Sequence, residues 1–160
     1  MNEQKKKAPD LRFKGFTDDW EQRKLGELSI IKDVDHRMPK SVKNGIPYIM
    51  VSDFKDDGSI DYENAKKISE SDYNSLSKKV KPILGDIIFA RYASIGAVRY
   101  VNTNIEFLPS YSCEIIRMKN DVNTNFAYFV LQSPYVKNQI KLNTKTGSQP
   151  NIGKDDLSNF

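Results

Sequence analysis

The order of apolar segments along the chain constrains its fold more than any other sequence feature. Short apolar runs rich in Ile, Val, Phe and Tyr come first, and runs of this kind predict β-strands. They span residues 46–54, 85–92, 97–101 and 111–118. Two segments with helical features follow, and in the second of them Ser133 is placed to cap a helix with Pro134 at its first position. The two helical segments are 123–132 and 133–142. Strands first and helices last predict an α+β fold: a single compact domain with a twisted mixed or antiparallel sheet and C-terminal helices.

The length of the chain suits one domain with a substantial core. Its 160 residues are 38% hydrophobic, which is enough to fill a core of that size. We divide the chain into a polar N-terminal arm over residues 1–19 and a domain over residues 20–160. Trp20, which is flanked by charged residues, is expected to anchor the arm by packing on the core. Ser69 or Ser71 is expected to cap one or two helical turns.

Several classes of protein are excluded by what the sequence lacks. No run approaches the roughly 18 apolar residues that a membrane-spanning helix needs, and the basic start lacks the apolar core of a signal peptide. The chain is therefore predicted to be cytoplasmic, with no membrane association. Cys113 is the only cysteine and His36 the only histidine, which excludes an internal disulfide and a zinc site with the usual ligands. We expect Cys113 in the core and His36 on the surface, and no nucleophile–base arrangement is present.

The acidic stretch around residue 57 has two interpretations. Carboxylate oxygens suit magnesium, so a small magnesium-dependent nuclease using Asp53, Asp57 and Asp61 is one of them. The other is a turn between two strands with Asp57 and Gly58 at its tip, because Asp-Gly is typical of such turns. The turn is favoured, and we expect no metal or cofactor in this chain.

Charge is distributed unevenly along the chain, although 25 basic and 21 acidic residues leave a net charge of only +4. Between Met50 and Ser75, seven acidic residues stand against three lysines. Between Val122 and Lys154 no acidic residue occurs. The lysines of this second segment are Lys137, Lys141, Lys145 and Lys154. Such a separation of charge suits a protein that meets a polyanion with one face, and solvated surfaces also produce it. The spacing of four would place Lys137, Lys141 and Lys145 along one side of a helix and its exit, where they could follow a phosphate backbone.

Two loops carry side chains suited to reading DNA. Arg91 follows an apolar run and precedes Tyr92 and Ser94, and an arginine can pair bidentately with guanine. The later "TGSQPN" loop carries glutamine and asparagine amides, which match the major-groove edge of adenine. The alternatives are a surface ion pair for Arg91 and an ordinary polar turn for the later loop. The candidate DNA-binding residues, which include a third loop near residue 40, are Arg37, Lys40, Lys43, Arg91, Tyr92, Ser94, Lys141, Lys145, Thr146, Gly147, Ser148, Gln149, Asn151 and Lys154.

Taken in order and spacing, four segments resemble a target recognition domain of the specificity subunit (HsdS) of type I restriction-modification systems. The segments are "PDLRFKGFTDDWEQRKLGEL" (9–28), "GIPYIMVSDF" (45–54), "LGDIIFARYASIGAV" (84–98) and "LQSPYVKNQIKLNTKTGSQPNIGKDDLSNF" (131–160). The resemblance covers essentially the whole chain. Its opening stretch, which contains Trp20, and its closing Gly-Ser-Gln stretch are the most specific parts. The position of Trp20 near the N-terminus suggests the first recognition domain of the subunit's two.

The resemblance implies a non-catalytic role. Each recognition domain of such a subunit reads one half of a bipartite sequence in double-stranded DNA. Methyltransferase subunits of the complex methylate adenine N6 with S-adenosylmethionine, and motor-nuclease subunits cleave unmodified DNA with ATP and magnesium. The chain itself would hold no cofactor.

The family pattern continues past the position of Phe160 into a long spacer helix, which is absent from this sequence. The chain is therefore either an excised domain or a half-subunit that finds its partner in trans. In both cases we expect a monomer when it is isolated. A protein-interaction fragment that occupies methyltransferase subunits without reading DNA is the remaining alternative.

Overall fold

The structure is a computed structural model that describes residues 14–15, 21–145 and 147–160. Two residues on which predictions fall, Trp20 and Thr146, lie outside these ranges, as does nearly all of the N-terminal arm.

A four-stranded antiparallel sheet forms the middle layer of the domain. Its strands are β1 (Ser29–Lys32), β4 (Ile87–Ala90), β5 (Val98–Tyr100) and β7 (Cys113–Met118), in the order β1-β7-β4-β5. Ile116 of β7 lies opposite Ile31 of β1 on one side and Ile87 of β4 on the other. The central strands β4 and β7 bury successive residues on both faces, which explains why they read as continuous apolar runs in the sequence.

A second, smaller sheet lies on one face of the first. It contains β2 (Ile46–Ile49), β3 (Lys67–Ile68) and β6 (Leu108–Pro109), with β2 antiparallel to β3 and parallel to β6. Helix α2 (Glu70–Leu76) follows β3 directly, and the side chain of Ser69 caps it by accepting a hydrogen bond from the amide of Asp72. The prediction of a short capped helix here is confirmed.

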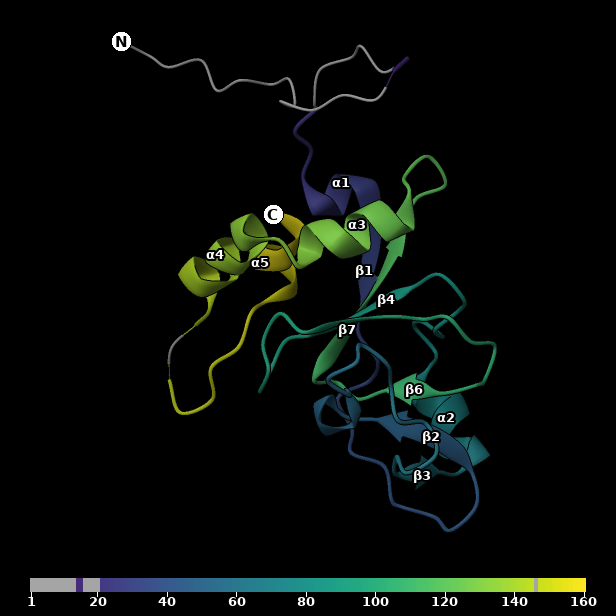
Figure 1. The fold of residues 1–160 in the computed structure, drawn as a ribbon. Helices are drawn as coiled ribbons and strands as arrows, with labels where there is room; N and C mark the ends of the chain where they lie inside the picture. Colours follow the sequence, from purple (N-terminus) through teal and green to yellow (C-terminus); the bar gives the residue numbers. More distant parts are fainter. Residues whose placement is uncertain (1–13, 16–20, 146) are drawn as a thin grey trace.

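The other helices gather on the opposite face of the four-stranded sheet. They are α1 (Leu25–Leu28), α3 (Thr124–Leu131), α4 (Pro134–Asn143) and α5 (Lys154–Ser158). Asn123 caps α3, and Ser133 caps α4 by accepting from the amide of Val136, with Pro134 at the start of the helix. Figure 1 shows these four helices above the sheet, and β2, β3, β6 and α2 below it.

The four-stranded sheet separates two apolar clusters. Ile88, Cys113 and Ile115 face the small sheet and α2, whereas Phe89 and Ile116 face the helices. The domain therefore has three layers: helices, a central sheet, and a small sheet with its own helix (Figure 1). Cys113 is fully buried, as predicted, and burial raises the pKa of its thiol to about 12.

The predicted α+β class is confirmed, and the strand content is divided between two sheets. The strand expected over residues 46–54 ends earlier, at Ile49, because residues Val51–Asp53 form a 3-10 turn. The side chain of Asp53 closes this turn by accepting a hydrogen bond of 2.7 Å from the amide of Met50. Among the helices that the structure describes, none combines the length and apolar character needed to cross a lipid bilayer.

The two-sided burial of β7 leads to a stability prediction. Ile116→Ala should lower the free energy of unfolding by about 2–5 kcal/mol, because it opens a cavity between the sheet and the helices. Ile30→Ala on β1 is the matched control, since that side chain is 51% exposed and should change stability far less. Urea denaturation of the two variants measures both effects, and equal losses would contradict this description of the core.

Candidate nucleic-acid interface

The loop between β4 and β5 is a tight turn that rests on α4. Ala93 and Gly96 have positive φ angles of 55° and 87°, and the amide of Gly96 donates to the carbonyl of Ala90 at 2.9 Å. A Cβ atom at Gly96 would lie 2.7 Å from Cδ1 of Ile140. The loop therefore approaches the helix closely at Gly96, where an added side chain would meet Ile140 and strain a backbone with positive φ.

The loop that follows α4 is held against this turn by backbone hydrogen bonds. The amide of Lys145 donates to the carbonyl of Asn151 at 2.8 Å, which closes the base of the loop. Asn151 also forms a backbone bridge with Tyr92, and the amide of Ile152 donates to the carbonyl of Arg91 at 3.2 Å. Figure 1 shows the yellow loop descending beside the teal turn between β4 and β5. The structure thus brings together the two loops that the sequence singled out separately.

A groove of about 630 Å³ runs between the β4–β5 turn and α4. Lys137 and Lys141, one helical turn apart and both exposed, line it from α4, and Ser94 lines it from the turn. Lys145 lies beyond the end of the helix, exposed, with its Nζ 3.9 Å from a carboxylate oxygen of Asp156. Lys137 and Lys141 therefore form a basic border along one side of the groove, whereas Lys145 does not line it.

The tip of the later loop points away from the rest of the domain. Gly147, Ser148 and Gln149 are exposed, and a Cβ atom at Gly147 would have nothing within 4 Å. The side-chain amide of Asn151 donates to the carbonyl of Gln149 at 3.2 Å, so this amide has a partner inside the loop. Lys154 is exposed at the start of α5.

Arg91 occupies a different environment from the lysines. Its side chain is only 12% exposed, with Nη1 3.0 Å from Oε1 of Glu114 and 3.7 Å from Oδ2 of Asp33. The guanidinium also lies over the ring of Tyr92, 5.3 Å from its centroid. The structure therefore directs Arg91 toward a buried carboxylate, and base contact by this side chain stays a prediction.

Glu114 is the buried partner of this pair. It is the second residue of β7 and only 1% exposed, and both of its carboxylate oxygens lack a hydrogen-bond donor among the described residues. Burial raises the pKa of the Glu114 carboxyl to about 7, with Arg91 opposing the shift and Asp33 adding to it. At Asp33 burial is the largest single influence and favours the neutral form, but the hydrogen bond and electrostatic attraction of His36, together with a backbone hydrogen bond and Lys79, outweigh it and lower the pKa of Asp33.

The third candidate loop belongs to the layer of the small sheet. Arg37 forms an ion pair of 2.8 Å with Asp72 of α2, and Lys40 and Lys43 are exposed on either side of a backbone bridge between Val42 and Lys67. These three residues are therefore not part of the groove beside α4. His36, which precedes them, is exposed as predicted.

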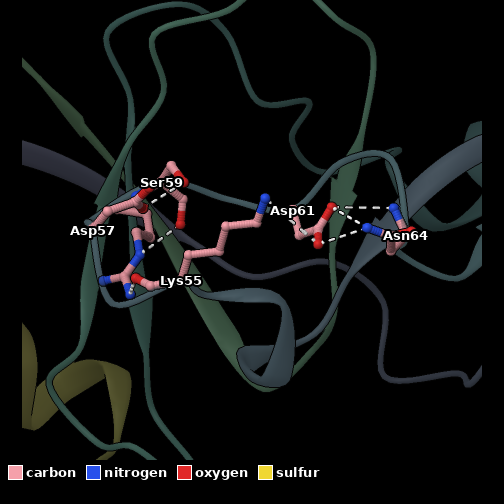
Figure 2. A network of polar contacts seen from close by, with 6 residues as sticks. Lys55, Asp57, Ser59, Asp61 and Asn64 are labelled. Carbon is pink, nitrogen blue, oxygen red and sulfur yellow. Dashed lines mark hydrogen bonds and ion pairs between the residues drawn. The ribbon is translucent and has the colours of Figure 1, made fainter.

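The acidic stretch forms a turn, as the sequence favoured, but an isolated bridge between Phe54 and Ile60 closes it instead of two strands. Asp57 accepts hydrogen bonds from the amide and hydroxyl of Ser59, and Asp61 accepts from the side chain of Asn64 while pairing with Lys55 at 3.6 Å (Figure 2). The carboxylates thus bond to neighbouring residues of the turn. Within the part of the chain that the structure describes, no group of three or more acidic, His or Cys side chains is placed to hold a metal ion.

The family model described as "Type I restriction modification DNA specificity domain" matches residues 17–160. The chain belongs to this family. The predicted family is thereby confirmed, together with the predicted role as a DNA-specificity component rather than a catalyst. No curated protein matches the chain.

Solved structures with the same fold include two specificity subunits. The specificity domain has a TM-score of 0.63 to the S subunit of a type I restriction-modification system from M. genitalium, at 17% identity over 96% of this chain and 36% of that one. The HsdS subunit from Thermoanaerobacter tengcongensis gives a TM-score of 0.58 at 19% identity, over 86% of this chain and 31% of that one. A chain from a structure of the type I R-M system, which addresses complex assembly and conformational transition, gives a TM-score of 0.59 at 17% identity. The match covers 86% of this chain and 32% of that one. The specificity domain spans about a third of the length of these chains.

Sequence reasoning missed two residues of the specificity domain that bear on the interface. Glu114 is a lone acid inside an apolar run, and a charge in a strand buried on both faces is the signal that could have identified it. Asp33 carried no comparable signal, because its contact with Arg91 depends on the path of the chain after β1.

The close contact at Gly96 predicts a local effect on stability. Gly96→Ala should cost about 1–3 kcal/mol, because the new methyl group meets Ile140 and the positive φ angle becomes strained. In Gly147→Ala the methyl group would meet open space, so a change within about 0.5 kcal/mol is expected. Thermal melting of both variants measures the difference, and equal melting temperatures would refute the tight packing of this turn.

The environment of Glu114 predicts a dependence of stability on pH. The native state holds the Glu114 proton more tightly than the unfolded chain, where the pKa is near its ordinary value of 4.5. This stabilisation is fully present below pH 4.5 and is lost as the pH rises through about 7. The difference in unfolding free energy between the native protein and Glu114→Gln should therefore fall by roughly 3 kcal/mol over that range. Denaturant titrations of both proteins at a series of pH values measure this difference. Parallel curves of unfolding free energy against pH would contradict the raised pKa of Glu114.

Proposed function

We propose that this specificity domain reads one half of a bipartite double-stranded DNA sequence for a type I restriction-modification complex. The observation that carries the proposal is that the β4–β5 turn lines one groove together with the lysines of α4 and is joined to the later loop by backbone hydrogen bonds. These loops lie far apart in the sequence, and backbone hydrogen bonds hold them side by side. A basic border near the exposed amide side chain of Gln149 suits duplex DNA, because phosphates bind cations and base edges bind amides.

The residues divide into two roles in this proposal. Lys137, Lys141 and Lys145 contact phosphates and fix the position of the domain on the duplex. Gln149 and the exposed loop around it reach the bases. The remaining members of the loop surface, Tyr92, Ser94, Thr146, Gly147, Ser148, Asn151 and Lys154, contribute backbone or polar contacts. Arg91 would read a base by exchanging its contact with Glu114 for the DNA, and Arg37, Lys40 and Lys43 would contact DNA outside the groove.

The partners of the domain belong to the same proposal. Methyltransferase subunits would supply adenine methylation with S-adenosylmethionine, and motor-nuclease subunits would supply cleavage with ATP and magnesium. The domain over residues 20–160 would act in the cytoplasm as the first of two recognition domains and hold no cofactor. We expect the isolated chain to be a monomer, and sedimentation at micromolar concentration tests this: a stable dimer would count against it.

Two kinds of substitution separate positioning from reading. Lys141→Ala should weaken binding to every DNA sequence about equally and reduce the slope of log affinity against log salt by about 1. Gln149→Ala should cost about 1–3 kcal/mol on the cognate half-site and little on random DNA. Lys81→Ala provides a matched control, because this exposed lysine bonds to Asn74 of α2 in the small-sheet layer.

The measurement is best made in a reassembled methyltransferase complex, where the sequences that become methylated report what is read. The proposal for these loops fails if Arg91→Ala and Gln149→Ala both leave the methylated sequence and its rate unchanged. In that case the loop from Arg37 to Lys43 becomes the candidate reader. Metal-dependent cleavage by the purified chain alone, abolished in Asp57→Ala, would instead support a nuclease.

A further inference from the structure

Arg91 and its buried carboxylate form an incomplete ion pair. Nη1 of Arg91 lies 3.0 Å from Oε1 of Glu114. Nevertheless, among the residues that the structure describes, Nε of Arg91 and both carboxylate oxygens of Glu114 are buried without a hydrogen-bond partner. Hydrogen bonds satisfy almost every buried polar atom in proteins, so an exception needs a structural or functional reason. The two groups attract each other by charge, without the aligned hydrogen bonds that make an arginine–carboxylate contact strong.

A second arginine of the same sheet forms a complete pair. Arg117 of β7 donates from Nε and Nη2 to the two carboxylate oxygens of Asp86, at 2.8 and 2.7 Å, and Nη2 also donates to the carbonyl of Lys81. Asp86 and Glu114 are equally buried, at 1% exposure each, so burial alone does not explain the poor geometry at Glu114. Arg117 is therefore fixed in the frame of the domain, whereas fewer bonds hold the side chain of Arg91.

The backbone of Arg91 is held more firmly than its side chain. Its amide donates to the carbonyl of Ser112 at 2.9 Å, and its carbonyl accepts from the amide of Ile152 at 3.2 Å. The guanidinium, in contrast, lies beside carboxylates and over the ring of Tyr92. Rotation about the side-chain bonds of Arg91 can therefore move the guanidinium while the turn that lines the groove beside α4 keeps its place.

Asp33 holds the same guanidinium from the segment after β1. Its Oδ2 lies 3.7 Å from Nη1 of Arg91 and is also bonded to Nε2 of the exposed His36. Arg91 thus lies between a carboxylate of a core strand and a half-buried one nearer the surface, and we call Glu114 and Asp33 the carboxylate clamp. A free guanidinium pairs bidentately with guanine in the major groove, so two carboxylates that hold it compete with that contact.

We infer that the carboxylate clamp sets the base preference of the domain by controlling how far Arg91 is available to guanine. The inference rests on the proposed function, in which Arg91 reads a base. Glu114 and Asp33 do not contact DNA in this scheme: they are positioning residues that act through Arg91. A weaker clamp should release the arginine and increase the preference for guanine, with every exposed residue of the two loops unchanged.

Chemical modification of Arg91 tests the clamp without DNA. Phenylglyoxal reacts with accessible arginines, and mass spectrometry of the full chain gives a rate for each of them. Glu114→Gln keeps the shape of the side chain and removes its charge, so Arg91 should react severalfold faster than in the native protein at about pH 8. Arg117 is the internal control, because its bonds to Asp86 do not involve Glu114. Equal rates at Arg91 in the two proteins would overturn the inference.

Binding to short duplexes of G·C or A·T pairs tests the effect on base preference. At about pH 8 and low salt, the ratio of affinities for the G·C and A·T duplexes should be severalfold higher in Glu114→Gln than in the native full chain. Adding Arg91→Ala to this variant should remove the gain, and a gain that persists would refute the role of Arg91. Glu27→Gln is the matched control: it makes the same change of charge beside the exposed Arg23, 2.8 Å away, and should leave the ratio unchanged.

The pH of the binding measurement distinguishes loss of the Glu114 charge from a general structural effect. Burial raises the pKa of Glu114 to about 7, and the charged groups that act on it are Arg91, Asp33, His36 and Lys154. The native carboxyl is therefore ionised at about pH 8 and mostly neutral at about pH 6, where it resembles the amide of Glu114→Gln. The difference in duplex preference between the two proteins should shrink at the lower pH. A difference of equal size at both pH values would contradict the inference.

Asp33→Asn keeps the inference open to refutation if Glu114→Gln unfolds the domain. This variant removes the longer contact of the clamp, so the reactivity of Arg91 and the preference for the G·C duplex should both rise, by less than in Glu114→Gln. If the duplexes bind but neither variant changes the ratio of their affinities, the inference is wrong and the proposed function stands. If the native chain and the variants bind neither duplex, the proposed function fails, and the role of the clamp in reading DNA fails with it.

Discussion

The burial of β7 on both faces is the constraint on which the rest of the domain depends. A strand with apolar residues on both sides needs a layer against each face, and here the helices cover one face while the small sheet and α2 cover the other. The same strand pairs with β1 and β4, so it fixes where β4 ends and where Arg91 begins the next turn. The position of the groove beside α4 thus follows from the packing of the central sheet.

Glu114 is the exception to the apolar character of β7, and it sits where that strand meets the interface. A buried carboxylate is costly unless a cation accompanies it, and Arg91 is the cation that lies 3.0 Å away. The pair draws the guanidinium inward at the point where the backbone of Arg91 also accepts a hydrogen bond from Ile152. Arg91 therefore links the core strand β7 through its side chain and the later loop through its backbone carbonyl. A change at Glu114 would reach the interface without touching any exposed residue.

The sequence predicted features that depend on neighbouring residues, and it missed features that depend on contacts between residues far apart in the chain. The start of α4 followed from Ser133 and Pro134, and the central strands followed from apolar runs around Ile88 and Ile115. Strands β3 and β6 have two residues each and exist only because β2 lies beside them, which no local pattern records. The candidate loops were found by residue type, but the bridge between Tyr92 and Asn151 joins positions whose proximity only the fold determines. Arg91 was chosen because an arginine can pair with guanine, and its contact with Glu114 of β7 depends on the fold.

The later loop separates the residues that hold it from the residues that it presents. Its base is closed by backbone hydrogen bonds between Lys145 and Asn151, and such bonds form with almost any side chain at these positions. At its tip Ser148 and Gln149 are exposed, and Gly147 has open space around it. Substitutions at the tip therefore change what the loop can bind while leaving the frame and the core untouched. In the proposed function, a change of target sequence at this tip would leave stability unchanged, because the exposed tip and the fold depend on different atoms.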